Sequence, residues 1–305
     1  TRESELYDQH VFPYLPVERF VQGTYLSAIM MPFTSREVET LTKRFEAWHT
    51  EGYRPYSSQR LAPGVDLCLC FNHRRDAKME ARFRAAFQQN GLGNYFRRLR
   101  FFYSNLTGLR DLYSTERKGR FGPEGYSAGP NNQFFDIVTR FSHGMARVML
   151  MESDVVPLCD DWRERVEAVA GSVEKFWICG SHYRGQGYLQ SFWHVNGNAI
   201  YDVGNADFRR FFSDVYLPYF RERVRQQPAL SYDVVMHDFF APLFAGRGDM
   251  SDLQNWSRYA HRIRFSDFIV NVSHEYDRQL QNQLTVFQAR RRFPDSVLFH
   301  GAVKI

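Results

Sequence analysis

The chain has 305 residues, of which 44% are hydrophobic and 24% are charged, a composition that predicts a globular protein with one large core or two small ones. Its formal net charge of +5 comes from arginines spread along the chain, without the basic run of a nucleic-acid-binding arm, so we expect no nucleic acid among its partners. No stretch approaches the roughly 20 apolar residues that span a bilayer, and the first residues lack a signal-peptide pattern.

The first half of the chain alternates apolar, strand-like runs with segments whose apolar residues recur at helical spacing. Pro32 marks the end of the first run, and a helix begins shortly after it. Strands are expected at 25–33, 65–71, 99–103 and 146–151, and helices at 35–48, 77–87 and 131–141.

The pattern becomes less regular after Asp154, where a polar, glycine-rich stretch at 180–204 interrupts the apolar segments. In this half of the chain the helices are expected near 161–170, 208–226 and 232–240, the strands at 175–179 and 268–272, and an extended tail at 296–305.

Strands that alternate with helices predict an α/β fold with a mostly parallel central sheet flanked by helices. Ligands bind such sheets beyond the carboxyl ends of the strands, so polar residues at those ends are candidates for a site. There is no internal repeat or clear linker, which predicts a single domain with a nucleotide-binding half at 1–155 and an acceptor half at 156–305. Because the sequence does not begin with Met, we expect it to be trimmed from a longer chain.

Two acidic residues, Glu152 and Asp154, directly follow the apolar run at 146–151. In an extended chain, residues i and i+2 face the same side, so both carboxylates are expected to face one ligand. Paired carboxylates repel unless a cation lies between them, and hard oxygen ligands prefer Mg²⁺ or Mn²⁺. The pattern favours a metal site; the alternative is a pair of loop carboxylates that cap the next helix.

The triplet Glu152-Ser153-Asp154 resembles the Asp-x-Asp motif of GT-A glycosyltransferases, both in sequence and in its place after the fourth strand–helix repeat. The resemblance implies a GT-A, Rossmann-like fold and the transfer of a sugar from a nucleoside-diphosphate sugar. It also implies Mn²⁺ or Mg²⁺ as the cofactor. The first acid here is Glu instead of Asp, a variation that the family tolerates, and because the second acid is the firmer metal ligand in that family, the resemblance favours Asp154 over Glu152.

The small-residue loop that begins at Gly125 leads into the helix expected at 131–141. Ser127 suits a helix cap, and the free amides of a helix start suit an anion or the polar edge of a base, although a plain turn and cap would explain the loop equally well. The loop resembles the one that contacts the nucleoside in many GT-A enzymes. By position, this loop and the strand ends supply the expected nucleotide contacts: Pro32, Phe33, Thr34, Ser104, Ser127, Gly129, Asn131 and Asn132.

The tail carries a histidine, a glycine and a lysine close together: His300, Gly301 and Lys304. Neutral imidazole binds divalent cations, glycine lets the backbone approach phosphate, and lysine offers a positive charge to a diphosphate. The tail resembles the late His…Gly-x-x-Lys element of glycogenin-like retaining transferases, although His300 directly precedes Gly301 whereas two residues separate them in that family. The resemblance implies that His300 completes the metal site and that Gly301 and Lys304 contact the diphosphate.

A polar turn at Asn196, Gly197 and Asn198 precedes a strand-like run. Amides on such a turn are good partners for sugar hydroxyls, and in GT-A enzymes a segment of this kind contacts the donor sugar. A simple Asn-Gly turn without a ligand is the alternative.

The helix expected at 232–240 contains two candidates for the general base, Asp233 as the first choice and Asp238 as the second. An inverting enzyme needs such a carboxylate to deprotonate the acceptor hydroxyl. In a retaining enzyme the leaving phosphate can take the proton instead.

Together these patterns predict a metal-dependent glycosyltransferase that moves a sugar from a nucleoside-diphosphate sugar, with a UDP-sugar as the expected donor, to a hydroxyl of a glycan or glycoprotein. The alternatives are a sugar-nucleotide nucleotidyltransferase and a non-catalytic carbohydrate-binding protein of the same fold. Asn-x-Ser/Thr triplets at Asn105, Asn255 and Asn271 are acceptors for N-glycans only in a secretory lumen, so both the Golgi lumen and the cytoplasm stay open as locations.

Overall fold

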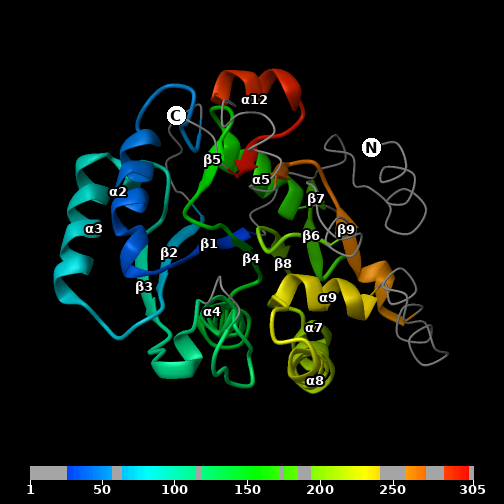
Figure 1. Cartoon of the computed structure of the whole chain (residues 1–305). Helices are drawn as coiled ribbons and strands as arrows, with labels where there is room; N and C mark the ends of the chain where they lie inside the picture. Colours follow the sequence, from blue (N-terminus) through cyan, green and yellow to red (C-terminus); the bar gives the residue numbers. More distant parts are fainter. Residues whose placement is uncertain are drawn as a thin grey trace.

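The computed structural model describes residues 26–56, 64–113, 118–171, 175–184, 194–240, 258–272 and 285–301. At its centre is a seven-stranded sheet with the strand order β3-β2-β1-β4-β8-β6-β9 (Figure 1). The strands of this sheet are β1 (Leu26–Phe33), β2 (Asp66–Phe71), β3 (Leu99–Tyr103), β4 (Arg147–Leu150), β6 (Ile178–Gly180), β8 (Ile200–Tyr201) and β9 (Ile263–Phe265).

Most neighbouring strands of this sheet run parallel. β1 pairs with β2 and β4, and β2 pairs with β3, all in parallel. β8 runs antiparallel to both β4 and β6, while β6 is parallel to β9. The expected α/β fold with a mostly parallel central sheet is therefore confirmed. The sheet continues past residue 155, so both predicted halves of the chain contribute strands to it.

A second, smaller sheet has the strand order β5-β11-β10-β7. β10 pairs in parallel with β11 and β7, and β11 pairs antiparallel with β5. The chain passes from the first sheet to this one through the short segment between β4 and β5, which contains the acidic triplet. The strands of the second sheet are β5 (Val155–Pro157), β7 (Tyr183–Arg184), β10 (Ile269–Val272) and β11 (Leu298–His300).

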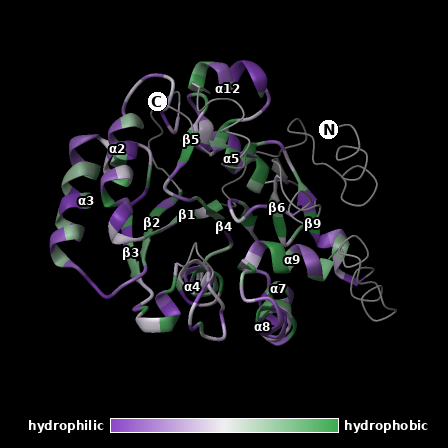
Figure 2. Ribbon diagram, viewed as in Figure 1, coloured by the Kyte–Doolittle hydropathy of each residue, from purple (hydrophilic) through white to green (hydrophobic). Residues whose placement is uncertain are grey.

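The central strands place successive side chains in two separate apolar layers. On β2, Leu67 and Leu69 belong to one buried cluster, whereas Cys68 and Cys70 belong to the other. A parallel sheet that is buried on both faces requires this, and it explains the continuous apolar sequence of the strand. Figure 2 shows the hydrophobic colouring of central strands such as β4 and β6.

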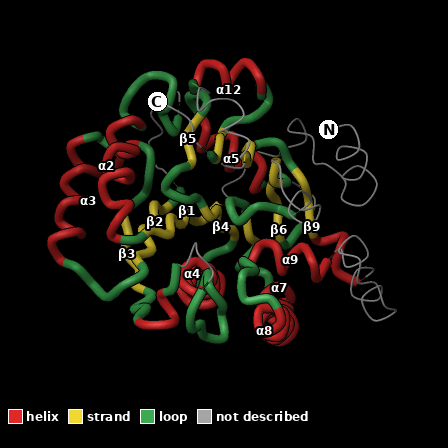
Figure 3. Tube along the Cα trace, in the orientation of Figure 1, coloured by secondary structure: helices red, strands yellow, loops and turns green. Residues whose placement is uncertain are grey.

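Helices cover both faces of the central sheet (Figure 3). Side chains of α2, α3 and α5 pack against the layer that contains Leu67, and side chains of α4, α7, α8 and α9 pack against the opposite layer. The helices are α2 (Val38–Ala47), α3 (Ala77–Gln89), α4 (Ala128–Asp136), α5 (Trp162–Ala170), α7 (Ala206–Arg210), α8 (Leu217–Gln226), α9 (Tyr232–Phe240) and α12 (Val286–Arg292), the last of which packs on the second sheet.

Several helices begin or continue with tighter or wider turns. A 3₁₀ helix, η2 (Ser35–Glu37), leads into α2, and another, η4 (Gly108–Asp111), follows β3. The helix expected at 131–141 begins earlier, as α4, and continues into a π-helical segment, η5 (Ile137–Phe141). The helix expected at 208–226 corresponds to α7, a second π-helical segment, η6 (Phe211–Tyr216), and α8 in succession. The remaining 3₁₀ helices are η3 (Leu92–Asn94) and η7 (Ala260–Arg262).

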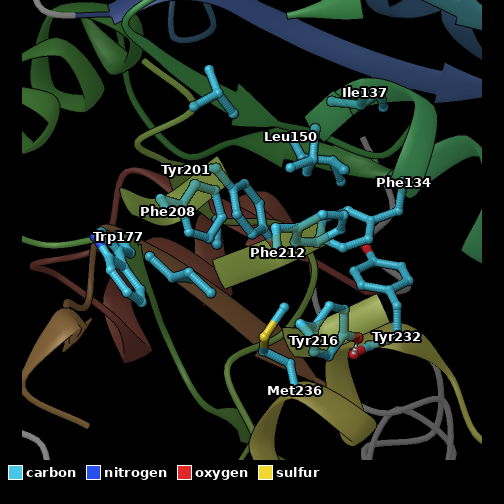
Figure 4. Close-up of a cluster of buried hydrophobic side chains, with 14 of the residues drawn as sticks. Phe134, Ile137, Leu150, Trp177, Tyr201, Phe208, Phe212, Tyr216, Tyr232 and Met236 are labelled. Atoms are coloured by element: carbon cyan, nitrogen blue, oxygen red, sulfur yellow. Dashed lines mark hydrogen bonds between the residues drawn. The ribbon is translucent and has the colours of Figure 1, made fainter. Parts of the chain in front are cut away.

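The layer beneath α4 and α9 is rich in aromatic side chains (Figure 4). Tyr232 stacks on Phe134 with ring centroids 3.8 Å apart and 12° between the ring planes. Phe134 also contacts Tyr201 and Phe212. Many aromatic residues of the described segments therefore serve the core, where each buries a large apolar area. Within the described segments, no helix has the length and apolar character needed to cross a membrane.

Candidate metal and nucleotide site

The acidic triplet forms a tight turn at the carboxyl end of β4. The amide of Val155 donates to the carbonyl of Glu152 at 3.2 Å, so the chain reverses across Ser153 and Asp154 and is not extended as expected from the sequence. Both carboxylates nevertheless face the same histidine. The turn, instead of strand alternation, brings them together.

His300 reaches this turn because β11 pairs with β5, which begins directly after the acids. The register places His300 opposite Val155. Nε2 of the imidazole lies 3.1 Å from Oε2 of Glu152 and 3.4 Å from Oδ1 of Asp154. One potential ligand atom from each of the three residues lies within 4.8 Å of the others. Two carboxylate oxygens and one imidazole nitrogen suit a divalent cation such as Mn²⁺ or Mg²⁺.

Asparagine side chains hold the first acid and the histidine. Asn198 accepts a hydrogen bond from the amide of Glu152 at 2.7 Å and donates to Oε2 of its carboxylate at 2.8 Å. Asn196 in turn accepts from the amide and the side chain of Asn198. On the other side of the site, Oδ1 of Asn271 lies 3.2 Å from Nδ1 of His300. The predicted sugar-contacting residues Asn196 and Asn198 thus orient Glu152 in this structure.

The electrostatics of the triad show that it favours a positive charge. Burial, the largest influence on Asp154, would raise its pKa, but the charge and hydrogen bond of His300 outweigh it and the pKa of Asp154 is lowered. Burial would lower the pKa of His300, yet Asp154 and Glu152 together raise that pKa well above its usual value. A proton on the imidazole therefore supplies the positive charge between the carboxylates, and a divalent cation can replace it. The donor set fits a metal ion for this reason.

A cavity of about 800 Å³ lies beyond the carboxyl ends of β1, β2 and β4, and the triad forms part of its wall. Two further carboxylates line it, those of Glu37 and Asp111. Arg36 is the one lysine or arginine among the described lining residues. Carboxylates therefore outnumber permanently cationic side chains in the described part of the wall.

The predicted nucleotide contacts at the end of β1 do line this cavity: Pro32, Phe33 and Thr34. Ser104, at the end of β3, is buried and lies outside the cavity lining, with its amide bonded to the carbonyl of Phe71. Ser104 does not line the cavity, and its predicted contact with the nucleotide stays a prediction.

The residues at the start of α4 act on the cavity through their neighbours. Ser127 is at the N-cap position of α4 but makes no side-chain capping bond. Gly129 packs against Tyr113, since a Cβ at Gly129 would lie 2.2 Å from the tyrosine ring. Asn131 and Asn132 are buried. Of these four residues, none lines the cavity itself, but Gly129 lets Tyr113 do so.

The two asparagines fasten the start of α4 to surrounding segments. Asn131 donates to the carbonyl of Glu124 at 2.9 Å and accepts from the amide of Tyr232 at 2.9 Å. Asn132 donates to the carbonyl of Arg110 at 3.0 Å. Since Tyr232 lines the cavity, Asn131 helps to position a cavity residue, and its predicted direct contact with the nucleotide stays a prediction.

Gly197 is required by the position of Tyr232. A Cβ at Gly197 would lie 1.8 Å from the Tyr232 hydroxyl oxygen and 2.7 Å from Cζ. The carbonyl of Gly197 also accepts from the Tyr201 hydroxyl at 3.1 Å. Packing against Tyr232 therefore explains why residue 197 is glycine, and its predicted contact with the donor sugar stays a prediction.

Asp233 and Asp238, the predicted bases, lie outside the lining of the large cavity. Asp233 accepts from Ser231 and lies 3.3 Å from Nε2 of His194; burial would raise its pKa, but these partners lower it to about 2. Asp238 lies 3.4 Å from Arg223, and burial raises its pKa to about 6. Asp233 borders a small pocket on the far side of Tyr232.

The tail continues past the histidine with Gly301, which is buried and has φ of 140°, a conformation that favours glycine. Lys304, the predicted diphosphate contact, lies outside the described residues. Its role stays a prediction.

Another polar cluster lines the cavity, and reasoning from the sequence missed it. Asp111 accepts from Asn72 at 2.8 Å, and its second oxygen lies 2.6 Å from Nε2 of His73. Near it, Tyr113 donates to Gln133 at 3.0 Å. Asn72 and His73 directly follow β2, so the end of that strand carried the same signal that pointed to β1 and β3. Asp111 and Tyr113 carry no such signal, since they follow the short helix η4.

No protein-family model matches the sequence, and no curated protein matches it. Among solved structures, the chain is similar to the apo form of mouse xyloside xylosyltransferase 1, with 13% sequence identity and a TM-score of 0.46 over 90% of this chain and 97% of that chain.

Proposed function

We propose that the chain is a metal-dependent glycosyltransferase that takes a sugar from a nucleoside-diphosphate sugar and transfers it to a hydroxyl of a glycan or glycoprotein. The observation that carries the proposal is the convergence of Glu152, Asp154 and His300 on one point of a large cavity at the carboxyl edge of the sheet. This edge is where nucleotides bind doubly wound sheets. The cavity volume of about 800 Å³ also falls within the range of roughly 300–1,000 Å³ that is usual for small-molecule sites.

The charges of the cavity support an anionic ligand that arrives with a cation. Four carboxylates line the described wall, those of Glu37, Asp111, Glu152 and Asp154, against the single guanidinium of Arg36. A diphosphate alone would be repelled by this surface. A neutral sugar alone would leave the acidic pair and His300 without a function. A nucleoside-diphosphate sugar with Mn²⁺ or Mg²⁺ satisfies both requirements.

Glu152, Asp154 and His300 are the residues that would hold the ion. When bound, the ion supplies positive charge that neutralises the diphosphate as the bond to the sugar breaks. Arg36 and, as predicted from the sequence, Gly301 and Lys304 would contact the same diphosphate. Electrostatic stabilisation of this kind is usually the largest contribution to the rate of such reactions.

The remaining predicted residues have roles at the two ends of the donor. Pro32, Phe33 and Thr34 would contact the nucleoside, because they line the cavity at the end of β1. Asp233 and Asp238 are proposed as bases only for an inverting reaction, in which Tyr232 would have to move to expose Asp233. In a retaining reaction the acceptor proton passes to the leaving phosphate.

The experiment that tests the proposal measures hydrolysis of a panel of nucleotide sugars with Mn²⁺, Mg²⁺ or a chelator, after thermal-shift screening of the same panel. Wild-type protein should release the nucleoside diphosphate only with a divalent cation. Asp154→Ala should abolish release and metal-dependent nucleotide binding while its thermal unfolding stays close to that of wild type. Asp295→Asn, at an exposed carboxylate, is the matched control and should behave as wild type. Turnover that is undiminished in chelator would contradict the metal dependence.

The same panel separates the two alternatives. A nucleotidyltransferase would form the nucleotide sugar from a nucleoside triphosphate and a sugar phosphate, with release of pyrophosphate. A non-catalytic carbohydrate-binding protein would bind sugars without releasing any nucleotide. Neither alternative produces free nucleoside diphosphate, which a glycosyltransferase releases.

A further inference from the structure

Ser153 connects the acidic turn to the opposite wall of the cavity. Its side chain is buried and its hydroxyl donates to Oε1 of Glu37. The other oxygen of Glu37 accepts from the amide of Thr34 at 2.8 Å and from its hydroxyl at 2.9 Å. One carboxylate therefore fastens two segments that both line the cavity, the end of β1 and the acidic turn.

Glu37 is itself held firmly by the core. It is the last residue of η2 and directly precedes α2, in which Leu41 and Phe45 are fully buried. From the same helix, Arg44 donates through Nε to the carbonyl of Ser153 at 3.2 Å. The turn is thus held by its hydroxyl and by its backbone from one rigid element.

We propose that Glu37 is a positioning residue that fixes the acidic turn through Ser153 and so prepares Glu152 and Asp154 for a divalent cation. The inference deepens the proposed function and rests on it. Movement of the turn would carry the two carboxylates away from the point at which they and His300 converge. The bond between Glu37 and Ser153 limits this movement, so that binding does not have to order the turn first.

In this scheme Glu37 acts through its hydrogen bonds, since both of its oxygens accept bonds from Ser153 or Thr34. This distinction can be tested with glutamine. In Glu37→Gln, the side-chain carbonyl can still accept from Thr34, and the amide can donate to the Ser153 hydroxyl. The bridge survives and the negative charge is lost. In Glu37→Ala, both the bridge and the charge are lost.

The test measures the dissociation constant of Mn²⁺ for the full chain, by calorimetry or by paramagnetic resonance of free Mn²⁺. Ser153→Ala and Glu37→Ala should each weaken Mn²⁺ binding about three- to tenfold, the usual range for one hydrogen bond. The double variant should bind no more weakly than the weaker of the two single variants, because both remove the same bond. Glu37→Gln should stay within about twofold of wild type, since its bridge is intact.

The matched control is Asp76→Ala, which removes another helix cap. Asp76 accepts from the amides of Lys78 and Met79 at the start of α3 and makes no contact with the acidic turn. It should lower the melting temperature, as loss of the bonds between Thr34 and Glu37 also should, without changing the Mn²⁺ dissociation constant. If lower stability alone weakened Mn²⁺ binding, Asp76→Ala and Glu37→Ala would both bind Mn²⁺ more weakly than wild type.

The outcomes separate the inference from the proposed function. Equal Mn²⁺ affinity in wild type, Ser153→Ala and Glu37→Ala would overturn the inference alone, as would multiplicative effects in the double variant. Weak binding by Glu37→Gln, equal to that of Glu37→Ala, would assign the effect to charge and also overturn it. If the variants show the expected Mn²⁺ dissociation constants but the wild-type protein releases no nucleoside diphosphate, the proposed glycosyltransferase activity is wrong and the positioning role of Glu37 stands. Wild-type protein that binds no Mn²⁺ would end both.

Discussion

Asn271 points Oδ1 at Nδ1 of His300 from 3.2 Å, and this contact decides which nitrogen of the histidine faces the acids. The amide of Asn271 is fixed in turn, because its Nδ2 donates to the Ser181 hydroxyl at 2.6 Å. When a cation replaces the proton on Nε2, the remaining proton of the imidazole therefore sits on Nδ1. Asn271, one of the three asparagines that begin a glycosylation triplet, is fully buried and serves the site instead.

Asn271→Ala should weaken Mn²⁺ binding by about 10- to 100-fold, because partners of this kind hold a ligand's orientation and tautomer. The dissociation constant is measured by calorimetric titration of the protein with Mn²⁺. Asn94→Ala, at an exposed asparagine, is the control and should leave the affinity unchanged. If the Asn271→Ala and wild-type affinities agree, His300 is not oriented by this contact or does not bind the ion.

Two adjacent residues of α9 should give the free energy of unfolding opposite pH dependences. Burial lowers the pKa of His237 from 6.5 to about 3, so only the unfolded chain takes up a proton as the pH falls through that window, and stability decreases. Burial raises the pKa of Asp238 from 3.8 to about 6, so the folded chain takes up a proton first, and stability increases. Between about pH 6 and pH 4 the two effects oppose each other, at about 1.4 kcal/mol per pH unit each.

Single variants should reveal the two slopes. His237→Leu should become more stable relative to wild type as the pH is lowered from about 6 to 4, and Asp238→Asn should become less stable over the same interval. The measurement is urea unfolding of the metal-free protein at several pH values. Identical slopes for the two variants would show that neither group is perturbed as the structure indicates.

Gly197→Ala should displace Tyr232, because the new Cβ would overlap its hydroxyl. The expected cost is about 1–3 kcal/mol in the free energy of unfolding, the usual price of overpacking. Adding Tyr232→Phe removes the closest atom and should restore part of the loss, though Cζ remains 2.7 Å from the Cβ position. Gly93→Ala, where the nearest atom would be 3.8 Å away, is the control. No rescue by the second substitution would mean that the Tyr232 hydroxyl is not the main obstacle.

Arg44 should matter to both stability and metal binding. Its guanidinium is buried and donates to the carbonyl of Ser153, with Nη2 at 3.5 Å from the carbonyl of Asp154. Arg44→Met leaves buried carbonyls without a donor, which should cost about 1–3 kcal/mol. It should also weaken Mn²⁺ binding, as the turn loses its support. Lys43→Met, at the exposed neighbouring position, should change neither quantity. A stability loss with unchanged Mn²⁺ affinity would limit Arg44 to a structural role.

The local pattern of the sequence was enough to predict the first elements of the central sheet, since β1, β2 and β3 are mostly apolar runs and α3 has regular helical spacing. Strands such as β7, with two residues, and β9, with three, show no period and exist only through distant partners. α12 was missed although its capping box, Thr285 with Gln288, can be read from the sequence.

The site divides in the same way. Glu152, Asp154 and His300 could be chosen by chemistry and position, and the structure brings them together. Glu37, Asp111 and Tyr113 could not, because they reach the cavity only through tertiary packing around η2 and η4. Asn196 and Asn131 were chosen as ligand contacts because their residue type suits hydrogen bonding. In the structure their side-chain amides bond to other protein groups instead.

The register in which β11 pairs with β5 determines whether His300 faces the two carboxylates. Leu298 and Phe299 belong to different buried clusters, so a slip of one residue would turn the imidazole into an apolar layer and present a benzyl group to the carboxylates. The cation site thus cannot exist before these two distant strands have joined, and non-local contacts of this type form late in folding. Uptake of Mn²⁺ during refolding should therefore lag behind the recovery of secondary structure, and would time the arrival of the last strand.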